Sequence, residues 1–316
     1  FYADFGVQEE YRIVLDSERP LYWWLAIRID EDILAFGRLR PVYFFFHFGK
    51  ILLLGANPHA LHLATTGFGV LTCFFFYVAA RRAGADILSA LVFILVFAVT
   101  GGQSTIWYWI FSPAETFGMF LTAVAVWALV RAAARADPSS WNAVALVLMA
   151  LAGLTKESFI LIIPALLLLR WVLECWFGHH SWRPALRKLR RFLLAGAAVF
   201  AIELLAVAVV MLSRPASYGA NIAGLSRASF DPRTWYSLLV SPGLAGLSVY
   251  GAAGATLLLI YACWPSHRRA RPYLLAAVLV VVAWLVPQLV LYRQGMAAHY
   301  LFPAIVAPAA VVGLAL

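Results

Sequence analysis

The chain has 316 residues, of which 64% are hydrophobic and 12% are charged, and its formal net charge is +9 at pH 7. About a quarter of the residues of a soluble domain are charged. The composition therefore excludes a soluble domain and is typical of a protein with several membrane spans. The basic residues are scattered between apolar runs, so membrane topology explains them better than a nucleic-acid partner does.

The apolar runs predict an all-α fold. Each run approaches the roughly 20 residues needed to cross a ~30 Å hydrocarbon core, and each is continuous rather than alternating, which favours helices over barrel strands. We therefore predict a polytopic transmembrane helical bundle with interfacial juxtamembrane helices on the outer face. The runs lie near 59–80, 87–109, 113–133, 158–177, 192–212, 242–264, 273–292 and 299–316.

Two parts of the chain differ in character. Residues 1–57 are predicted to form an extracytoplasmic first loop with juxtamembrane helices, and residues 58–316 a bundle of about nine spans. Because the sequence starts at Phe1 and is still apolar at its last residue, we expect a fragment of a longer chain. The cysteines lie in or at the end of apolar runs without disulfide or metal spacing and are interpreted as packing residues: Cys73, Cys175 and Cys263.

Basic residues occupy every second segment between the runs. The positive-inside rule places these segments in the cytoplasm and the alternate segments, 110–112, 155–157, 213–241 and 293–298, outside. The Ala, Leu and Arg-rich composition indicates a bacterium, so we expect a bacterial inner membrane with the active site facing the periplasm or the exterior. The basic segments are Arg81–Arg82, Arg131–Arg135, Arg183–Arg191 and Arg268–Arg271.

The first forty residues hold eight of the 15 acidic residues. The apolar run that follows, Pro41–Leu54, reaches only ~21 Å as a helix and is too short to span. We therefore place it in the interface and the acidic segment outside. The aromatic residues Tyr22, Trp23 and Trp24 fit helices at headgroup depth.

Three acids of this segment are candidate bases. Asp4 should follow directly on a missing span, and Glu9 and Glu10 stand next to Tyr11. A carboxylate at a span end beside a cavity can take a proton from a hydroxyl. The alternative is a solvated acidic surface.

Three cations are candidate phosphate ligands. Arg38 and Arg40 offer planar, forked donors, although they could equally anchor a helix to lipid headgroups. The Trp141–Leu154 run is also short, so Lys156 and Glu157 are expected to be recessed and to need partners or a ligand. The alternative there is a neutralising neighbour pair capped by Thr155.

Other polar residues complete the predicted outer rim. Arg293 is a further phosphate candidate, and His299 and Tyr300 follow it at the mouth of the last span. A histidine there can also be an ordinary hydrogen-bonded interface residue. Glu115 lies two residues into a span, where a charge is costly. The sequence contains no glycine-rich phosphate loop after a strand and no HExxH, CxxC or GxSxG motif.

The stretch GRLRPVYFFFHFGKILLLGANPHALHL resembles a passage of the GT-C superfamily of integral-membrane glycosyltransferases, close to the protein O-mannosyltransferase and aminoarabinose transferase branch. GLTKESFILIIPALLLL, WYWIFSPAETFGMFL and HYLFPAIVAP resemble further passages of that family. The resemblance covers most of the chain from residue 37 to about residue 165, together with the end of the chain.

The resemblance implies a transferase that moves a sugar from a polyprenyl-phosphate donor to an acceptor hydroxyl of a glycan, lipid or protein outside the membrane. The family's base corresponds to Asp4, with Glu9 and Glu10 as the competing placement. Arg38, Arg40 and Lys156 would lie near the donor phosphate. Supporting positions would be Glu157, Glu115, His62, His299 and Tyr300.

The chemistry requires one carboxylate and a few fixed cations, because the donor phosphate is already a good leaving group. Displacement from the opposite face would invert the anomeric carbon. A divalent cation stays open as a cofactor, although no ligand cluster demands one.

Two other function classes stay open. A transporter or flippase would use ionisable groups near the bilayer midplane, for which Glu203 and Glu174 are the candidates. A non-catalytic assembly subunit would retain the fold without chemistry.

Overall fold

The computed structural model describes residues 20–99, 113–178, 181–213, 271–291 and 302–315. Helices make up 89% of the described residues, which contain no strand, so the predicted all-α fold is confirmed. In chain order the helices are α2 (Leu21–Phe36), α3 (Pro41–Leu54), α4 (Pro58–Ala83), α5 (Ile87–Val99), α7 (Pro113–Ala133), α8 (Ser139–Gly153), α9 (Glu157–Ile160), α10 (Ile163–Gly178), α11 (Trp182–Ser213), α15 (Arg271–Leu291) and α16 (Phe302–Ala315).

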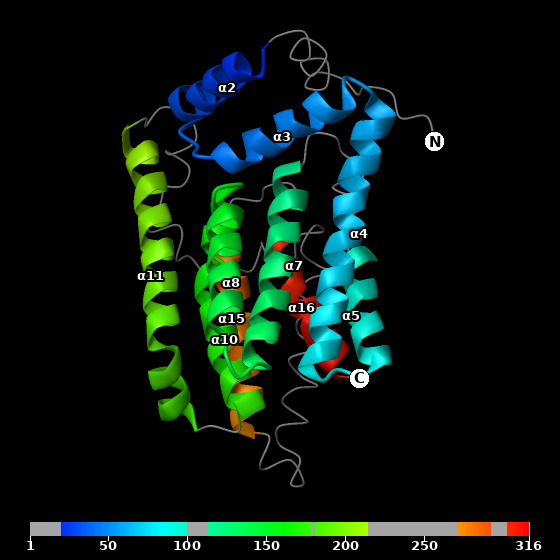
Figure 1. Ribbon diagram of the computed structural model, residues 1–316, viewed down its shortest axis with the longest axis vertical. Coiled ribbons are helices and arrows are strands. Elements are labelled where there is room, and N and C mark those ends of the chain that lie inside the picture. Colours follow the sequence, from blue (N-terminus) through cyan, green and yellow to red (C-terminus); the bar gives the residue numbers. More distant parts are fainter. Residues whose placement is uncertain (1–19, 100–112, 179–180, 214–270, 292–301, 316) are drawn as a thin grey trace, which may run out of the picture.

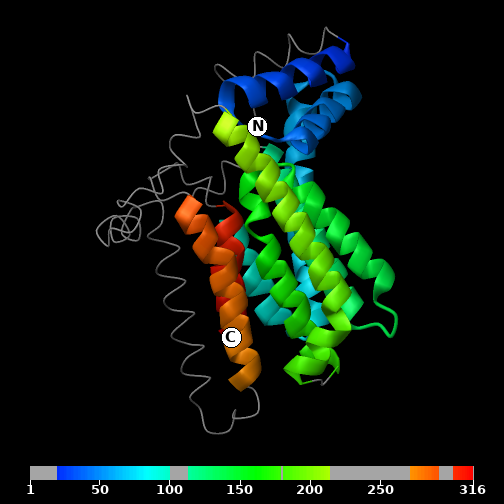
Figure 2. The ribbon, with the colours of Figure 1, turned by 90° about the vertical axis from the view of Figure 1, so that its left-hand side faces the viewer.

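Most helices run side by side along the long axis of the molecule, whereas α2 and α3 lie across one end of the bundle (Figure 1). We call this the α3 end. The opposite end holds the last turns of α4 and α7 and the first turns of α8 and α11, and we call it the basic end (Figure 1). The second view shows α15 and α16 together on one side and α11 crossing the other helices (Figure 2).

Within the described part of the chain, four helical stretches are long and apolar enough to cross a membrane: Pro58–Ala83, Ala114–Ala133, Glu157–Gly178 and Trp182–Val210. The helices α3, α5 and α8 are shorter apolar helices. The predicted run 242–264 lies outside the described residues. The protein is thus a membrane-embedded helical bundle.

The helix α11 begins ten residues before the predicted run 192–212, at Trp182. The basic segment Arg183–Arg191 was expected to be a loop, and this expectation is wrong. Arginine, leucine and lysine favour helices. In addition, Lys188 of this segment donates a 2.6 Å hydrogen bond to Glu174 of α10, which holds the turn against the bundle.

Small residues let the central helices approach closely. Ala123, Ala125 and Ala128 of α7 are completely buried. A Cβ atom added at Gly118 would lie 2.4 Å from the Phe159 ring, so α7 and α9 can pack as they do only with glycine there. Such contacts are typical of membrane helices, because lipid provides no hydrophobic drive for association.

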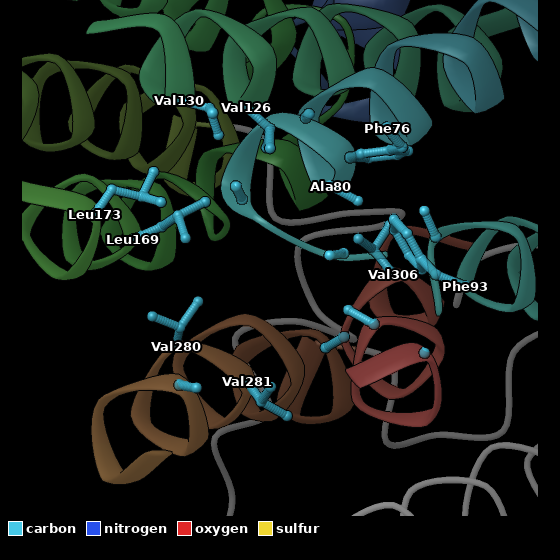
Figure 3. Close-up of a pocket in the computed structure, with 18 of the residues that line it drawn as sticks. Phe76, Ala80, Phe93, Val126, Val130, Leu169, Leu173, Val280, Val281 and Val306 are labelled. Carbon is cyan, nitrogen blue, oxygen red and sulfur yellow. The ribbon is translucent and has the colours of Figure 1, made fainter. Parts of the chain in front are cut away.

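A cavity of about 260 Å³ lies between α4, α5, α7, α10, α15 and α16 in the half of the bundle near the basic end. Figure 3 shows the apolar side chains that project into it, among them Phe76, Phe93, Val130 and Leu173. Among the described residues, its lining contains no charged side chain, so these residues offer no ion pair to a phosphate.

Candidate functional site

The turn between α2 and α3 places two arginines at the α3 end. Gly37 ends α2 in the left-handed conformation (φ 62°), where its N–H donates to the Ile33 carbonyl oxygen, and glycine is favoured at that position. Pro41 opens α3, where its missing N–H costs nothing. Arg38 and Arg40 lie between these two residues, at the junction of the two helices.

The turn between α8 and α9 lies beneath α3. The N–H of Val42 in α3 donates to the carbonyl oxygen of Leu154 at 3.2 Å, which joins the two segments through their backbones. Thr155 and Lys156 are buried, with exposed fractions of 0% and 2%. The protein therefore encloses Lys156, while its depth below the membrane surface stays a prediction.

Two buried ion pairs hold this region together. Arg40 donates from Nε and Nη2 to the carboxylate of Glu157, with a shortest distance of 2.7 Å. Lys156 donates to Glu115 in the first turn of α7. The pairs join α3 to α9 and the α8–α9 turn to α7. We call Arg40, Glu115, Lys156 and Glu157 the paired cluster.

Lys156 and Glu157 each form an ion pair with a residue distant in sequence. The backbone of Lys156 is extended (φ −163°, ψ 142°), so adjacent side chains point in opposite directions. Lys156 thus reaches Glu115, and Glu157 reaches Arg40. Thr155 does not cap α9, because its hydroxyl donates to the Ala152 carbonyl oxygen at 2.6 Å.

Asp32 lies beside the paired cluster and was not singled out from the sequence. Burial raises its pKa to about 6, although the charges of Arg40 and Arg38 oppose this rise. Its Oδ2 atom is buried and has no hydrogen-bond partner within the described part of the chain. Burial also lowers the pKa of Arg40, but Glu157, Asp32 and Glu115 together outweigh this effect and raise it.

A second buried cation was also missed. Lys50 of α3 is 5% exposed and donates to the hydroxyl of Thr65 in α4 at 3.2 Å. Burial lowers the pKa of Lys50 to about 8. A lone lysine in the apolar sequence PVYFFFHFGKILLL was the available signal.

Arg40 keeps part of its donor capacity. Glu157 takes up Nε and Nη2, whereas Nη1 makes no hydrogen bond with a described residue. The side chains of Arg40 and Glu157 are 14% and 12% exposed, compared with 3% for Lys156. An anion could therefore reach Arg40 more easily than Lys156.

The other predicted site residues are not part of this cluster. His62 lies in α4, is half-buried, and takes no part in the ion pairs described at the α3 end. The remaining predicted site residues lie outside the described residues: Asp4, Glu9, Glu10, Arg293, His299 and Tyr300.

No group of three histidine, cysteine, aspartate or glutamate residues that could hold a metal is found among the described residues. The paired cluster contains two carboxylates, but each is held by a cation. The cluster therefore holds its charges in fixed positions, while a role for a divalent ion stays a prediction.

The fold and this cluster define a class of protein, a helical membrane-embedded bundle with charged groups enclosed at one end. Comparison of the chain with known protein families, with curated proteins and with solved structures returns no match.

Proposed function

We propose that the protein is a membrane glycosyltransferase that uses a polyprenyl-phosphate sugar donor and acts at the α3 end. The observation that carries the proposal is the paired cluster: charges from segments distant in sequence meet beneath two helices that lie across the bundle. Buried ion pairs often add little net stability to a fold, so their presence here calls for an explanation other than stability. Fixed cations that meet the charge of a departing phosphate provide one.

In the proposed reaction, the bond between the anomeric carbon and the phosphate oxygen breaks, and the electron pair stays on that oxygen. The acceptor hydroxyl bonds to the anomeric carbon from the opposite face, and its proton passes to a carboxylate. Arg40 would bind the phosphate through Nη1, and Lys156 would add its charge at a greater depth. Partial exclusion of water strengthens both interactions.

The base in this proposal is one of four carboxylates. Asp4, Glu9 and Glu10 follow from the resemblance to the GT-C superfamily. Asp32 joins them, because its pKa of about 6 is near the value expected of a base that works at neutral pH. Its position beside Arg38 and Arg40 places it close to the proposed phosphate.

The test uses the full chain in vesicles with polyprenyl phosphates that carry different labelled sugars. Release of the sugar is measured for the wild type and for D4N, E9Q, E10Q, D32N and R40Q. We expect one acid variant to abolish release and R40Q to lower it by about 100-fold. R28Q is the matched control, because Arg28 lies at the same end and pairs with Glu31 within α2.

A separate measurement follows binding of polyprenyl phosphate without sugar. R40Q should weaken this binding and R28Q should not. Equal binding by both variants, or wild-type release in all five substituted proteins, would remove the proposed site.

A second candidate function is transport of a lipid-linked or small polar substrate. It is favoured by Glu203 of α11, which is 6% exposed and whose Oε2 atom has no hydrogen-bond partner in the described part of the chain. An unpaired acid inside a span is a functional candidate. If E203Q stops vesicle uptake or flipping of a polyprenyl-phosphate sugar in a protein that releases none, transport replaces transfer.

A further inference from the structure

The basic end carries a cluster of arginines around two tryptophans. The guanidinium carbon of Arg131 lies 5.4 Å from the ring centre of Trp127 and 5.1 Å from that of Trp141. Arg82 lies 5.8 Å from Trp127, and Arg135 lies 5.7 Å from Trp141. The two indoles meet edge to face at 5.1 Å. The side chains come from α4, from α7 and the residues just after it, and from α8, and we call them the Arg/Trp cluster.

The arginines of this cluster have no carboxylate partner among the described residues. Two acids lie in the same turns of the chain, but both are engaged in the turns themselves. Asp86 accepts hydrogen bonds from the backbone and hydroxyl of Ser89, and Asp137 accepts the equivalent bonds from Ser139. The positive charge of the cluster is thus not neutralised by the described protein.

Arg131 carries the strongest indication of a missing partner. Its Nε atom is buried and makes no hydrogen bond with a described residue. The like charges of Arg82 and Arg135 both act on it. A buried donor without an acceptor is unfavourable, and like charges in proximity add to this cost. An anion bound between the three guanidinium groups would relieve both.

The membrane supplies such an anion at this depth. Arg82 and Arg131 lie in the last turns of two helices long enough to span, where lipid headgroups are expected. Exposed apolar side chains continue from the cluster along α4 and α8, with Phe74 two turns before Arg82 and Val144 one turn after Trp141. Lipid tails could lie along this surface while the headgroup contacts the arginines.

We propose that Arg82, Arg131 and Arg135, held by Trp127 and Trp141, bind the phosphate headgroup of an anionic phospholipid. Guanidinium groups contact phosphate with two donors at once, and stacking on the indoles fixes their planes. Clustered basic residues at a membrane surface favour anionic lipids over neutral ones. The site is separate from the paired cluster and does not depend on the proposed transferase activity.

The test compares lipid binding to the full chain purified in detergent, measured by native mass spectrometry. Phosphatidylglycerol should bind more tightly than phosphatidylcholine with the same tails. The triple variant R82Q/R131Q/R135Q should lose at least about tenfold in affinity for phosphatidylglycerol. The matched control is R183Q/R187Q/R191Q, which removes the same charge from the same end and should stay within about twofold of the wild type.

Further arms distinguish the remaining outcomes. The triple Arg→Lys variant retains the charge and tests the geometry of the guanidinium groups, and it also serves if the glutamine variant does not fold. We expect its affinity for phosphatidylglycerol to lie between those of the wild type and the glutamine variant. Equal losses in the glutamine variant and the control would mean general surface attraction, and unchanged binding in the glutamine variant would mean no site. Displacement of the lipid by excess glycerol phosphate or inorganic phosphate would identify a site for a free phosphate. Each of these three results overturns the proposal.

Discussion

The two ends of the bundle hold their cations differently. At the α3 end each cation of the paired cluster meets a carboxylate from another segment, so the cluster is close to neutral. At the basic end the guanidinium groups of Arg82, Arg131 and Arg135 lie against aromatic rings, and no described acid pairs with them. The charges of the paired cluster are thus matched within the protein, whereas those of the Arg/Trp cluster are proposed to meet a lipid anion. Removing one charge of the paired cluster should therefore affect folding, and removing charges of the Arg/Trp cluster should affect lipid binding.

The largest effect is expected for Lys156→Met. The substitution leaves Glu115 buried without its cation, which typically costs about 3–5 kcal/mol. Thermal unfolding in detergent should show a large decrease in Tm. The double variant K156M/E115L should recover most of the loss, because it removes both charges. The matched substitution at the basic end is Lys188→Met, whose side chain is 46% exposed and which should cost far less.

Asp32→Asn should act in the opposite direction and only at neutral pH. The pKa of Asp32 is about 6 when folded, above its ordinary value of 3.8, so the charged carboxylate destabilises the folded state. This penalty is absent below about pH 4, grows between pH 4 and 6, and is complete above about pH 6, where it amounts to at most about 3 kcal/mol. The variant should raise Tm at about pH 7.5 and leave it unchanged at about pH 3.5.

The exposed Asp30 provides the control for this measurement. Asp30→Asn should change Tm little at either pH. A stabilisation by Asp32→Asn that persists at low pH would contradict burial of the charge as its cause.

Gly118→Ala tests the close packing beneath the paired cluster. The added methyl group would lie 2.4 Å from the Phe159 ring and 2.5 Å from the Thr155 hydroxyl, so α7 or α9 must move. We expect a loss of about 2 kcal/mol, measured as a lower Tm. Gly67→Ala in α4 meets nothing within 4 Å and should be neutral or slightly stabilising. Equal behaviour of the two variants would contradict the close approach.

The smallest effect on folding is expected for Arg135→Gln at the basic end. The variant loses an exposed contact with Trp141 and also loses repulsion with Arg131, so the two changes nearly cancel. Tm in detergent without anionic lipid should change by no more than the equivalent of about 0.5 kcal/mol. Added phosphatidylglycerol should then raise the Tm of the wild type more than that of the variant. A large decrease in Tm without lipid would mean that Arg135 contributes to folding.

Much of the α3 end could be predicted from local sequence. The short runs Pro41–Leu54 and Trp141–Leu154 indicated a helix that does not span and a recessed turn, since helix length follows directly from residue count. The structure has a helix lying across the bundle and a buried Lys156 in these places.

The partners of the charged residues could not be predicted in this way. Arg40 and Glu157 are 117 residues apart in sequence. Lys156 forms its ion pair with Glu115, which is 41 residues away. The direction of the Lys156 side chain depends on the extended backbone of that residue, which the sequence did not indicate. The arginines of the basic end had an ordinary explanation as topology signals, and its two tryptophans were not singled out. Their meeting across three elements is visible only in the fold.

The sequence separation within the paired cluster has a consequence for biogenesis. A nascent chain is made from its N-terminus, so Glu115 leaves the ribosome 41 residues before its cation and Arg40 leaves 117 residues before its carboxylate. Until α9 is synthesised, α3 lacks both the Glu157 carboxylate and the Leu154 carbonyl oxygen that hold it. The contacts that hold α3 can therefore form only after residues 154–157 have been synthesised, and a chain interrupted before Leu154 would leave the charges of Arg40 and Glu115 unmatched.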